Sequence, residues 1–323
     1  MGFPFYLRPV LYFLLPALLL PAISWAQQEG CTDSLALNFD VNAVMNDGSC
    51  TYADFNLKFR RAVSKMPASI NESSGLIWWR NCYWTHNDNG GKNEVYCLDS
   101  ITGTIKQTIS IKDATNNDWE DMTHDEDYIY IGDFGNNFGN RSDLSIYKVA
   151  KIDIPVNGDT IVDCEKINFS YADQREFTAR NLNNDYDCEA MTSFGDSLYL
   201  FTKNWITFTS RLYAMPKKPG SYYIYPIDEY NINGLVTGAC FDADSRRVVL
   251  CGYHNYIPFI VIFSDYWRND FFGGNKRRIN FENHFATQTE AITFIRDNTY
   301  SISSERTRIR KSRIYNIDLT EIY

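Results

Sequence analysis

The sequence has few basic residues for its length and only one long apolar run. Its 323 residues carry 31 Lys and Arg against 40 Asp and Glu, so the formal charge is −9. Nucleic-acid binding needs clustered Lys and Arg for phosphate contacts, and this charge balance argues against it. The hydrophobic fraction of 44% and the mean hydropathy of −0.35 exclude a polytopic membrane protein and a largely disordered one.

Several catalytic and binding signatures are also missing. The chain contains no G-x-S-x-G, H-E-x-x-H, G-x-G-x-x-G or paired C-x-x-C pattern, which argues against a nucleophile elbow, a zincin helix, a dinucleotide cradle and a zinc ribbon. Helix-period patterns are almost absent as well. Aromatic residues make up 15% of the chain, with 22 Tyr and 21 Phe, and this composition favours β-structure.

The single apolar run lies at the N-terminus. Residues 1–26 carry one charged residue, Arg8, then an apolar stretch from Val10 to Ile23, then Ser24-Trp25-Ala26. This pattern is typical of a secretory signal peptide, with a retained N-terminal anchor as the alternative. We therefore expect a secreted, periplasmic or cell-surface protein with no membrane span after signal cleavage. Its eight cysteines, an even number, would then meet an oxidising compartment that favours disulfides.

Residues 27–53 form a small segment rich in Asp and Asn. Residues 30–52 read GCTDSLALNFDVNAVMNDGSCTY, which resembles the GCTD…ALN…DGSC module of many secreted bacterial surface proteins. The resemblance implies a Cys31–Cys50 disulfide. So short a segment builds no core of its own, and closing its loop contributes about 3 kcal/mol.

Oxygen-bearing side chains in this module suggest either a calcium site or a set of Asx turns. They are Asp33, Asn38, Asp40, Asn42, Asn46 and Asp47.

Residues 54–323 repeat with a period of about 50 residues. The repeat starts are Ser74, Glu120, Glu189, Gly238 and Glu290. Each start opens a predicted β-hairpin, which a third strand follows. A fourth strand is predicted in four of the five units, and in the third unit it covers residues 222–227. Tandem four-stranded units predict an all-β propeller with five blades; six blades or an irregular β-sandwich are the alternatives. Residues 54–63 have a strand-like pattern that would complete the last blade and close the ring.

The other six cysteines allow several structural disulfides, whose connectivity stays open at this stage. The pairs that the predicted strands suggest are Cys82 with Cys97, Cys240 with Cys251, and Cys164 with Cys188.

In a propeller the innermost strands start, and the second strands end, on one face, so two sets of side chains should meet at the top of the central channel. The first set consists of predicted metal ligands: Glu72, Glu120, Asp121, Glu189 and Glu290. Crowded carboxylates repel each other unless a cation binds, some are protonated, or basic groups pair with them. Oxygen ligands favour calcium, with magnesium second. The alternative is that these acids accept backbone N–H bonds from a neighbouring blade.

The second set consists of predicted ligand-binding residues: Asp88, Asp133, Lys203, Tyr253 and Glu305. His86 belongs to the same polar run as Asp88 and is the candidate general base, the alternative being a solvated loop histidine.

Five motifs of the repeat region resemble a group of uncharacterised secreted bacterial propellers. They are Glu72, Ser74-Gly-Leu76, Thr85-His-Asn-Asp88, Asn117-Asp-Trp-Glu-Asp-Met122 and Ile131-Gly-Asp-Phe-Gly-Asn-Asn137. The chain departs from the pattern at Asn89 and Asn136, which replace Ser and Asp. More distantly it is similar to phytase-like and lactonase-like propellers, and that resemblance implies a divalent metal in a central acidic site.

These patterns predict a secreted, monomeric propeller that binds an extracellular ligand or surface partner at an acidic, calcium-loaded face. The alternative is a metal-dependent hydrolase of phosphate esters or lactones, and a purely structural surface protein is a third interpretation. The sequence leaves open whether the protein is an enzyme.

Overall fold

The computed structural model describes residues 1–2, 28–55, 57–63 and 65–323. The predicted signal peptide covers residues 1–26, of which residues 3–26 lie outside the described residues. Four short 3-10 turns are the only helical elements of the described part: η1 (Lys151–Asp153), η2 (Phe271–Gly273), η3 (Glu282–His284) and η4 (Thr320–Ile322). No helix in that part is long and apolar enough to cross a membrane.

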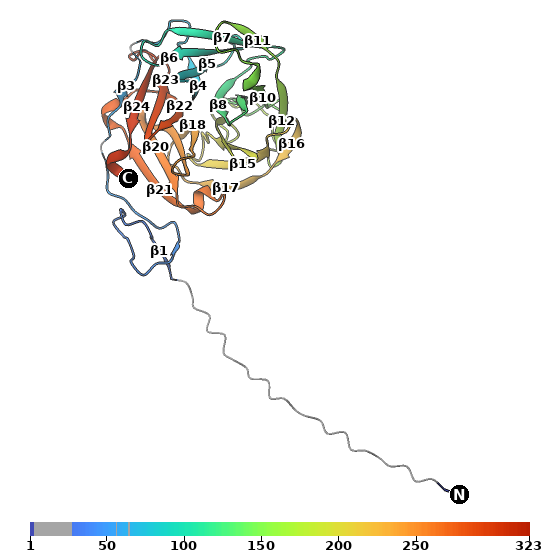
Figure 1. Ribbon diagram of the computed structural model, residues 1–323, viewed down its shortest axis with the longest axis vertical. Coiled ribbons are helices and arrows are strands. Elements are labelled where there is room, and N and C mark those ends of the chain that lie inside the picture. The colour runs from blue at the N-terminus through green and yellow to red at the C-terminus, as the bar shows by residue number, and fades with distance from the viewer. Residues whose placement is uncertain (3–27, 56, 64) are drawn as a thin grey trace.

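The strands form five blades around a central axis (Figure 1), which confirms the predicted all-β, five-bladed propeller. The innermost strands are β4 (Ser73–Trp79), β8 (Trp119–His124), β13 (Cys188–Phe194), β18 (Leu235–Asp242) and β22 (Thr289–Arg296). The second strands are β5 (Cys82–Asn87), β9 (Tyr128–Asp133), β14 (Ser197–Thr202), β19 (Arg247–His254) and β23 (Thr299–Ser304). The third strands are β6 (Glu94–Asp99), β10 (Ser145–Ala150), β15 (Ser210–Pro216), β20 (Ile257–Ser264) and β24 (Arg313–Asp318). The fourth strands are β7 (Ile105–Ile111), β12 (Glu165–Tyr171), β17 (Pro226–Tyr230), β21 (Asn275–Asn280) and β3 (Arg60–Arg61).

The first segment of the propeller closes the ring, as predicted. Strand β3 pairs antiparallel with β24, so that Arg61 lies opposite Tyr315 and Arg60 opposite Asn316. The paired part is shorter than residues 54–63, but buried side chains on either side, Phe59 and Val63 among them, anchor the segment against the last and first blades.

Two blades carry a fifth strand that the sequence pattern did not indicate. β11 (Thr160–Val162) pairs parallel with β7 of blade 1, and β16 (Gly220–Ile224) pairs parallel with β12 of blade 2. Each belongs to the segment that precedes the fourth strand of the following blade. Residues 222–227 are therefore not one strand: their first part covers blade 2, and the fourth strand of blade 3 starts at Pro226. The added strands satisfy edge groups that would otherwise face solvent.

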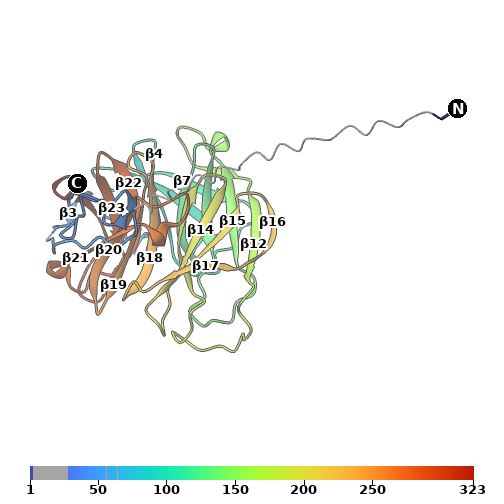
Figure 2. The same ribbon diagram turned by 90° about the horizontal axis from the view of Figure 1, so that it is seen from below.

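Neighbouring blades pack face to face (Figure 2), and their contact surfaces form the core. Between blades 1 and 2, for example, Ile77 and Trp84 meet Trp119, Met122 and Ile131 in one buried cluster. Because both faces of each blade are covered, most residues of the second and third strands are buried.

The six other cysteines are free, which corrects the three suggested disulfides. Cys97 lies opposite Trp84 rather than Cys82, and Cys251 lies opposite Gly238 rather than Cys240. Cys164 packs between blades 1 and 2, whereas Cys188 is buried between blades 2 and 3, so this pair does not meet.

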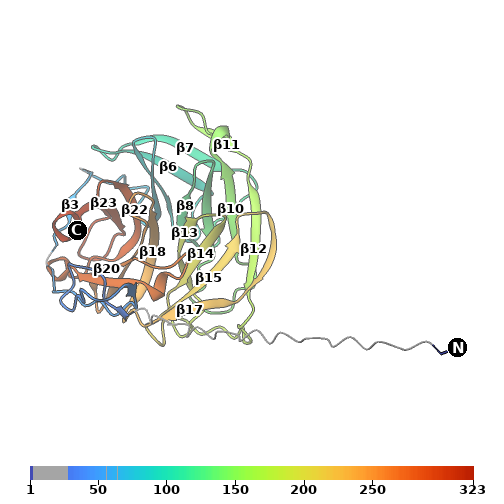
Figure 3. The ribbon, with the colours of Figure 1, turned by 60° about the horizontal axis from the view of Figure 1, so that its bottom comes forward.

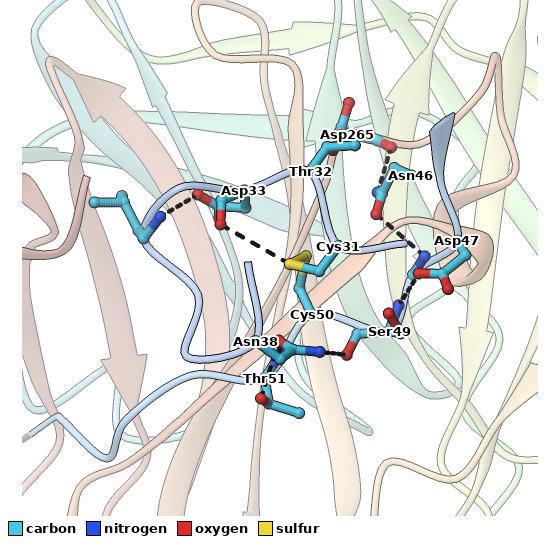
Figure 4. The surroundings of a disulfide bond; sticks show 12 residues. Cys31, Thr32, Asp33, Asn38, Asn46, Asp47, Ser49, Cys50, Thr51 and Asp265 are labelled. Carbon is cyan, nitrogen blue, oxygen red and sulfur yellow. Dashed lines mark hydrogen bonds between the residues drawn. A yellow bond between two sulfur atoms is a disulfide. The ribbon is translucent and has the colours of Figure 1, made fainter. Parts of the chain in front are cut away.

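The N-terminal module packs beside blade 4 (Figures 3 and 4). It contains a short parallel pair, β1 (Glu29–Gly30) and β2 (Met45–Asn46), and the Cys31–Cys50 disulfide is confirmed. Thr32 Oγ1 donates to Asp265 Oδ2 at 3.0 Å and Asn46 Nδ2 donates to the Asp265 carbonyl at 3.2 Å.

The acids of the module form Asx turns. Asp33, Asp40 and Asp47 accept the backbone N–H groups of Leu35, Asn42 and Ser49, each at 2.9 Å. Among the described residues, the acids that converge closely enough to share a metal ion lie elsewhere, in the propeller.

One buried carboxylate, that of Asp121, joins three blades at the axis. Its Oδ1 accepts the N–H of Met122 at 2.8 Å, and its Oδ2 accepts those of Met191 at 2.8 Å and Ala239 at 3.2 Å. Burial raises the pKa of Asp121, and the three N–H donors offset part of that rise. Asp121, predicted as a metal ligand, thus accepts hydrogen bonds that hold neighbouring blades together. This is the alternative that the sequence analysis gave for the acids.

We expect Asp121→Asn to lower the free energy of unfolding by about 3 kcal/mol or more, because an amide nitrogen would face N–H donors in a buried site. Urea unfolding followed by tryptophan fluorescence would measure the loss. Asp127→Asn, an exposed change in the same blade, is the matched control. Equal unfolding midpoints for the two variants would contradict the bridging role.

Candidate functional site

Each innermost strand contains a β-bulge close to its start. The register shifts lie between Ser73 and Leu76, Trp119 and Met122, Cys188 and Ala190, Val236 and Gly238, and Thr289 and Ala291. A bulge leaves residues unpaired and re-aims their side chains. The residues at the equivalent position of the five bulges are Ser74, Glu120, Glu189, Thr237 and Glu290. The sequence alignment placed Gly238 there, and the structure corrects this by one residue.

A polar pocket of about 160 Å³ lies at this end of the channel. Its walls come from all five blades: Glu72, Ser74, Asp88, Glu120, Asn137, Glu189, Lys203, Trp205, Tyr253, Gln288, Glu290 and Glu305. The pocket thus brings together four of the five predicted metal ligands, leaving out Asp121. It also brings together four of the five predicted ligand-binding residues, leaving out Asp133.

Strand register explains why Asp133 lies outside the pocket. Asp133 pairs with Trp119, the residue that directly precedes the bulge of β8. In blades 1, 3, 4 and 5 the pocket is lined by the residue that follows the position equivalent to Asp133. Asp133 is fully buried; its Oδ1 accepts the N–H of Asp118 at 3.1 Å and pairs with Arg141 Nη2 at 3.0 Å, while Asn117 Nδ2 donates to its Oδ2 at 2.9 Å. Asp133 therefore positions the segment that carries Asp118.

His86 is also outside the pocket, and its geometry does not suit a general base. The side chain is fully buried, edge-on to the Trp119 ring at 5.4 Å, and its Nδ1 donates to the Asn87 carbonyl at 3.0 Å. Burial lowers the pKa of His86 to about 4, so the ring is neutral. The His86 side chain packs in the contact with blade 2 and does not line the pocket.

Three carboxylates form the tightest acidic group of the described residues. Asp88, Asp118 and Glu120 each offer an oxygen, and these oxygens all lie within 4.8 Å of one another. Asp118 is 9% exposed, and its Oδ1 has no hydrogen-bond partner. The backbone of Gly135 packs so closely here that a Cβ would lie 2.3 Å from Glu120 Oε1 and 2.5 Å from Asp118 Oδ2. The site therefore holds an unpartnered oxygen ligand and a glycine that makes room for two carboxylates.

Two acids were missed in the sequence, although a signal for them exists: Asp118, and Asp187, whose Oδ2 accepts the Nε1–H of the pocket residue Trp205 at 2.7 Å. Each stands two residues before a repeat start, at Glu120 and Glu189, and residues two apart share a face of a strand. Glu72 and Gln288 stand in the same relation to Ser74 and Glu290, and both line the pocket.

Burial and mutual repulsion raise the pKa of most of these acids. The pKa of Asp118 rises to about 7 because it is buried near Asp88 and Asp187, and that of Glu290 rises to about 8 because it is buried near Glu305. Burial and Asp88 raise the pKa of Glu305 to about 7, and burial raises that of Glu120 well above its usual range. Neighbouring carboxylates thus leave this end of the channel short of positive charge.

Lys203 supplies the buried positive charge of the pocket. Its Nζ lies 3.1 Å from Glu189 Oε1, and both side chains are almost fully buried. Burial lowers the pKa of Lys203, but the Glu189 carboxylate more than offsets this and holds it well above the usual range. Because this ammonium is already paired with Glu189, it does not neutralise the other acids of the pocket.

A larger groove of about 720 Å³ adjoins the pocket and shares Trp205, Tyr253 and Gln288 with it. Apolar and aromatic side chains line much of it, including Phe208, whose ring stacks on that of His254 at 5.6 Å. Aromatic walls with a few polar groups are typical of sites for organic ligands. The sequence analysis identified only Tyr253 among these residues.

Comparison with known proteins gives no family assignment. No family model and no curated protein matches the chain. A crystal structure of a nidogen/laminin complex is similar with 15% identity and a TM-score of 0.40, over 76% of this chain and 84% of that one. A gluconolactonase from Xanthomonas campestris is similar with 13% identity and a TM-score of 0.39, over 77% and 86%. A glucose dehydrogenase is similar with 6% identity and a TM-score of 0.44, over 78% and 98%. Likenesses at this level assign neither family nor activity.

We expect the melting temperature in the presence of EDTA to fall as the pH rises from about 5 to about 8. Asp118, Glu290 and Glu305 hold their protons in the folded protein up to about pH 7 to 8, whereas unfolded acids release theirs near pH 4. Their contribution to stability is complete below about pH 4 and is lost as the pH rises through their folded pKa values.

Differential scanning fluorimetry across this pH range would measure the trend. Glu290→Gln removes one of the titrating groups and should make the slope shallower. A melting temperature that rises with pH in EDTA would contradict the assignment.

Proposed function

We propose that this chain is a secreted, monomeric propeller that binds an extracellular ligand through a divalent cation held in the acidic pocket. The observation that carries the proposal is the group formed by Asp88, Asp118 and Glu120, with its unpartnered, buried Asp118 Oδ1. Three carboxylates held this close repel each other strongly in a buried site, and a cation removes that repulsion.

Calcium fits the donor set best. The pocket walls offer carboxylate, amide and hydroxyl oxygens, and they contain no His or Cys among the described residues. Calcium accepts six to eight oxygens in flexible geometry, whereas magnesium demands a tighter octahedron. Asp88, Asp118 and Glu120 would hold the ion, and Glu72 and Glu305 also line the pocket. Magnesium is the second choice.

The adjoining groove supports ligand binding rather than a purely structural ion. It opens from the pocket at Trp205 and Tyr253, so that a ligand held at the ion has an aromatic surface beside it. Aromatic side chains give a large contact area at low entropic cost. The ligand would be a polar molecule whose oxygens reach the ion while its body lies in the groove.

Two features support the proposal that the protein is secreted. The N-terminal pattern is that of a signal peptide, and the Cys31–Cys50 disulfide is of the kind that persists in oxidising compartments. We propose a secreted or cell-surface location.

One observation favours a second candidate, a hydrolase of phosphate esters or lactones. Glu305 and Glu290 face the pocket with pKa values raised to about 7 and about 8 by burial and neighbouring acids, which suits proton transfer near neutral pH. A bound divalent ion would polarise a phosphoryl or carbonyl oxygen. In the hydrolase hypothesis, Glu305 takes a proton from the attacking water, and Lys203 stabilises the negative charge that develops on the phosphoryl or carbonyl oxygen.

We expect calcium to bind with micromolar or tighter affinity and to raise the melting temperature. Asp88→Asn and Glu120→Gln should each weaken binding by at least about 100-fold, because each removes a charged ligand. Isothermal titration calorimetry with calcium and magnesium would measure both effects. Glu126→Gln, an exposed acid at the other end of the channel, is the control. If neither ion binds, or if Glu126→Gln has the same effect as the two site variants, the proposed cation site is wrong.

Turnover separates the two candidate functions. A screen of phosphate esters and lactones with and without calcium should show no calcium-dependent hydrolysis if the pocket only binds. Hydrolysis that disappears in Glu305→Gln, while calcium affinity falls only slightly, would establish the hydrolase instead.

A further inference from the structure

A second cavity lies at the opposite end of the channel from the acidic pocket. It has a volume of about 530 Å³ and is built by the later parts of the five innermost strands. Leu76, Met122, Ala239 and Ile292, which follow the bulges, form its floor and take no part in the acidic pocket. The two cavities are therefore separate sites with different walls.

The walls of this lower cavity are mainly apolar. Trp78, Phe194, Phe241 and Phe294 are half-buried around it, one from each of four blades. Its volume falls within the range of roughly 300–1,000 Å³ that is typical of small-molecule sites, which combine apolar walls with a few placed polar groups.

A buried ammonium stands at one side of the lower cavity. Lys151 is 8% exposed and lines the cavity; its Nζ donates to His124 Nδ1 at 2.9 Å and to the Asp125 carbonyl. Among the described residues no carboxylate forms an ion pair with it. Asp125, Asp127 and Glu126 act on this ammonium only from a distance. A buried charge with no carboxylate in direct contact is costly, so an anion that pairs with it would be bound favourably.

The neighbouring charges leave room for such an anion. The Asp125 carboxylate is already satisfied by Lys217 at 2.8 Å and by the Tyr130 hydroxyl at 2.9 Å. Glu126 is exposed at the rim. Burial lowers the pKa of His124 to about 4, so this ring is neutral and its Nδ1 accepts the hydrogen bond from the Lys151 ammonium. Burial lowers the pKa of Lys151 to about 8, a change that a bound anion would reverse.

The wall of the lower cavity also contains a buried hydroxyl without a hydrogen-bond partner. Thr192 lines the lower cavity with 0% exposure, and its Oγ1 has no hydrogen-bond partner. The hydroxyls of Thr123 and Thr293, which also line the cavity, accept the N–H groups of Ser193 and Trp78. Thr192 thus differs from the neighbouring threonines, whose hydroxyls are engaged.

We infer that the lower cavity binds an amphipathic carboxylate such as a medium-chain fatty acid, with its alkyl chain on the aromatic walls and its carboxylate on Lys151. This function is additional to the cation site and needs no metal. The carboxylate pairs with the Lys151 ammonium, and the alkyl chain covers Trp78, Phe194, Phe241 and Phe294.

Dodecanoate, used below its micelle-forming concentration, is the probe. Isothermal titration calorimetry and the fluorescence of Trp78 would measure its affinity for the full mature chain, with calcium and with EDTA. We expect micromolar binding that is the same in both buffers. Dodecanol and dodecyltrimethylammonium should each bind at least tenfold more weakly, because neither pairs with Lys151.

Variants locate the site. Lys151→Met should weaken dodecanoate binding at least tenfold, and Lys106→Met, at an exposed lysine of blade 1, is the matched control. Ala243→Trp fills the mouth at an exposed position and should abolish binding in a folded protein, which keeps the test decisive even if Lys151→Met fails to fold.

Four results would overturn the inference, and three of them concern the lower cavity alone. They are the absence of dodecanoate binding, equal affinity for dodecanol and dodecanoate, and binding that Ala243→Trp leaves unchanged. Binding that is lost in Glu120→Gln but not in Ala243→Trp would place the probe in the acidic pocket and would also overturn it.

Discussion

The fold and its two cavities depend on the hydrogen bonds that Asp121 makes at the axis. A propeller holds its blades together by apolar packing, which resists separation but allows neighbouring sheets to slide. The Asp121 carboxylate fixes the height of blades 2, 3 and 4, because it accepts N–H groups at equivalent positions of β8, β13 and β18. Ser74 and Thr237 add hydroxyl bonds to the carbonyls of the next blade, Glu120 and Thr289. The bulged residues therefore stand in one ring.

That alignment has an electrostatic consequence. Once the blades are held at one height, Glu120, Glu189 and Glu290 face the same small volume, and desolvation prevents water from screening them. The repulsion among these carboxylates is reduced by one lysine, by protonation of acids whose pKa values are raised and, in our proposal, by a metal ion. Such crowding lowers stability, and proteins usually retain a destabilising arrangement where a site requires it.

The sequence predicted the blades well because a repeat shows directly in the pattern of residues. It predicted most of the acidic pocket because the acids stand at repeat starts. Its errors have local causes. Asp133 and His86 lie in the correct polar runs but at strand positions whose side chains turn away, and Gly238 was chosen over Thr237 because a bulge shifts the count by one residue. Asp118 was overlooked although strand alternation points to it. The lower cavity had no signature, because Lys151 is brought to it by a turn after a third strand rather than by the repeat.

Ring closure by β3 also sets the order of events in biosynthesis. The strand that completes blade 5 comes from residues 60–61, whereas its partner β24 lies near the C-terminus. Within blades 1 to 4 the paired strands all come from the same unit or the next one along the chain, so each of these sheets can form while the chain is still being made. The last blade must wait until translation has passed Asp318. A chain that stalls or is truncated before this point is left with an open ring, exposed sheet edges and a marked tendency to aggregate.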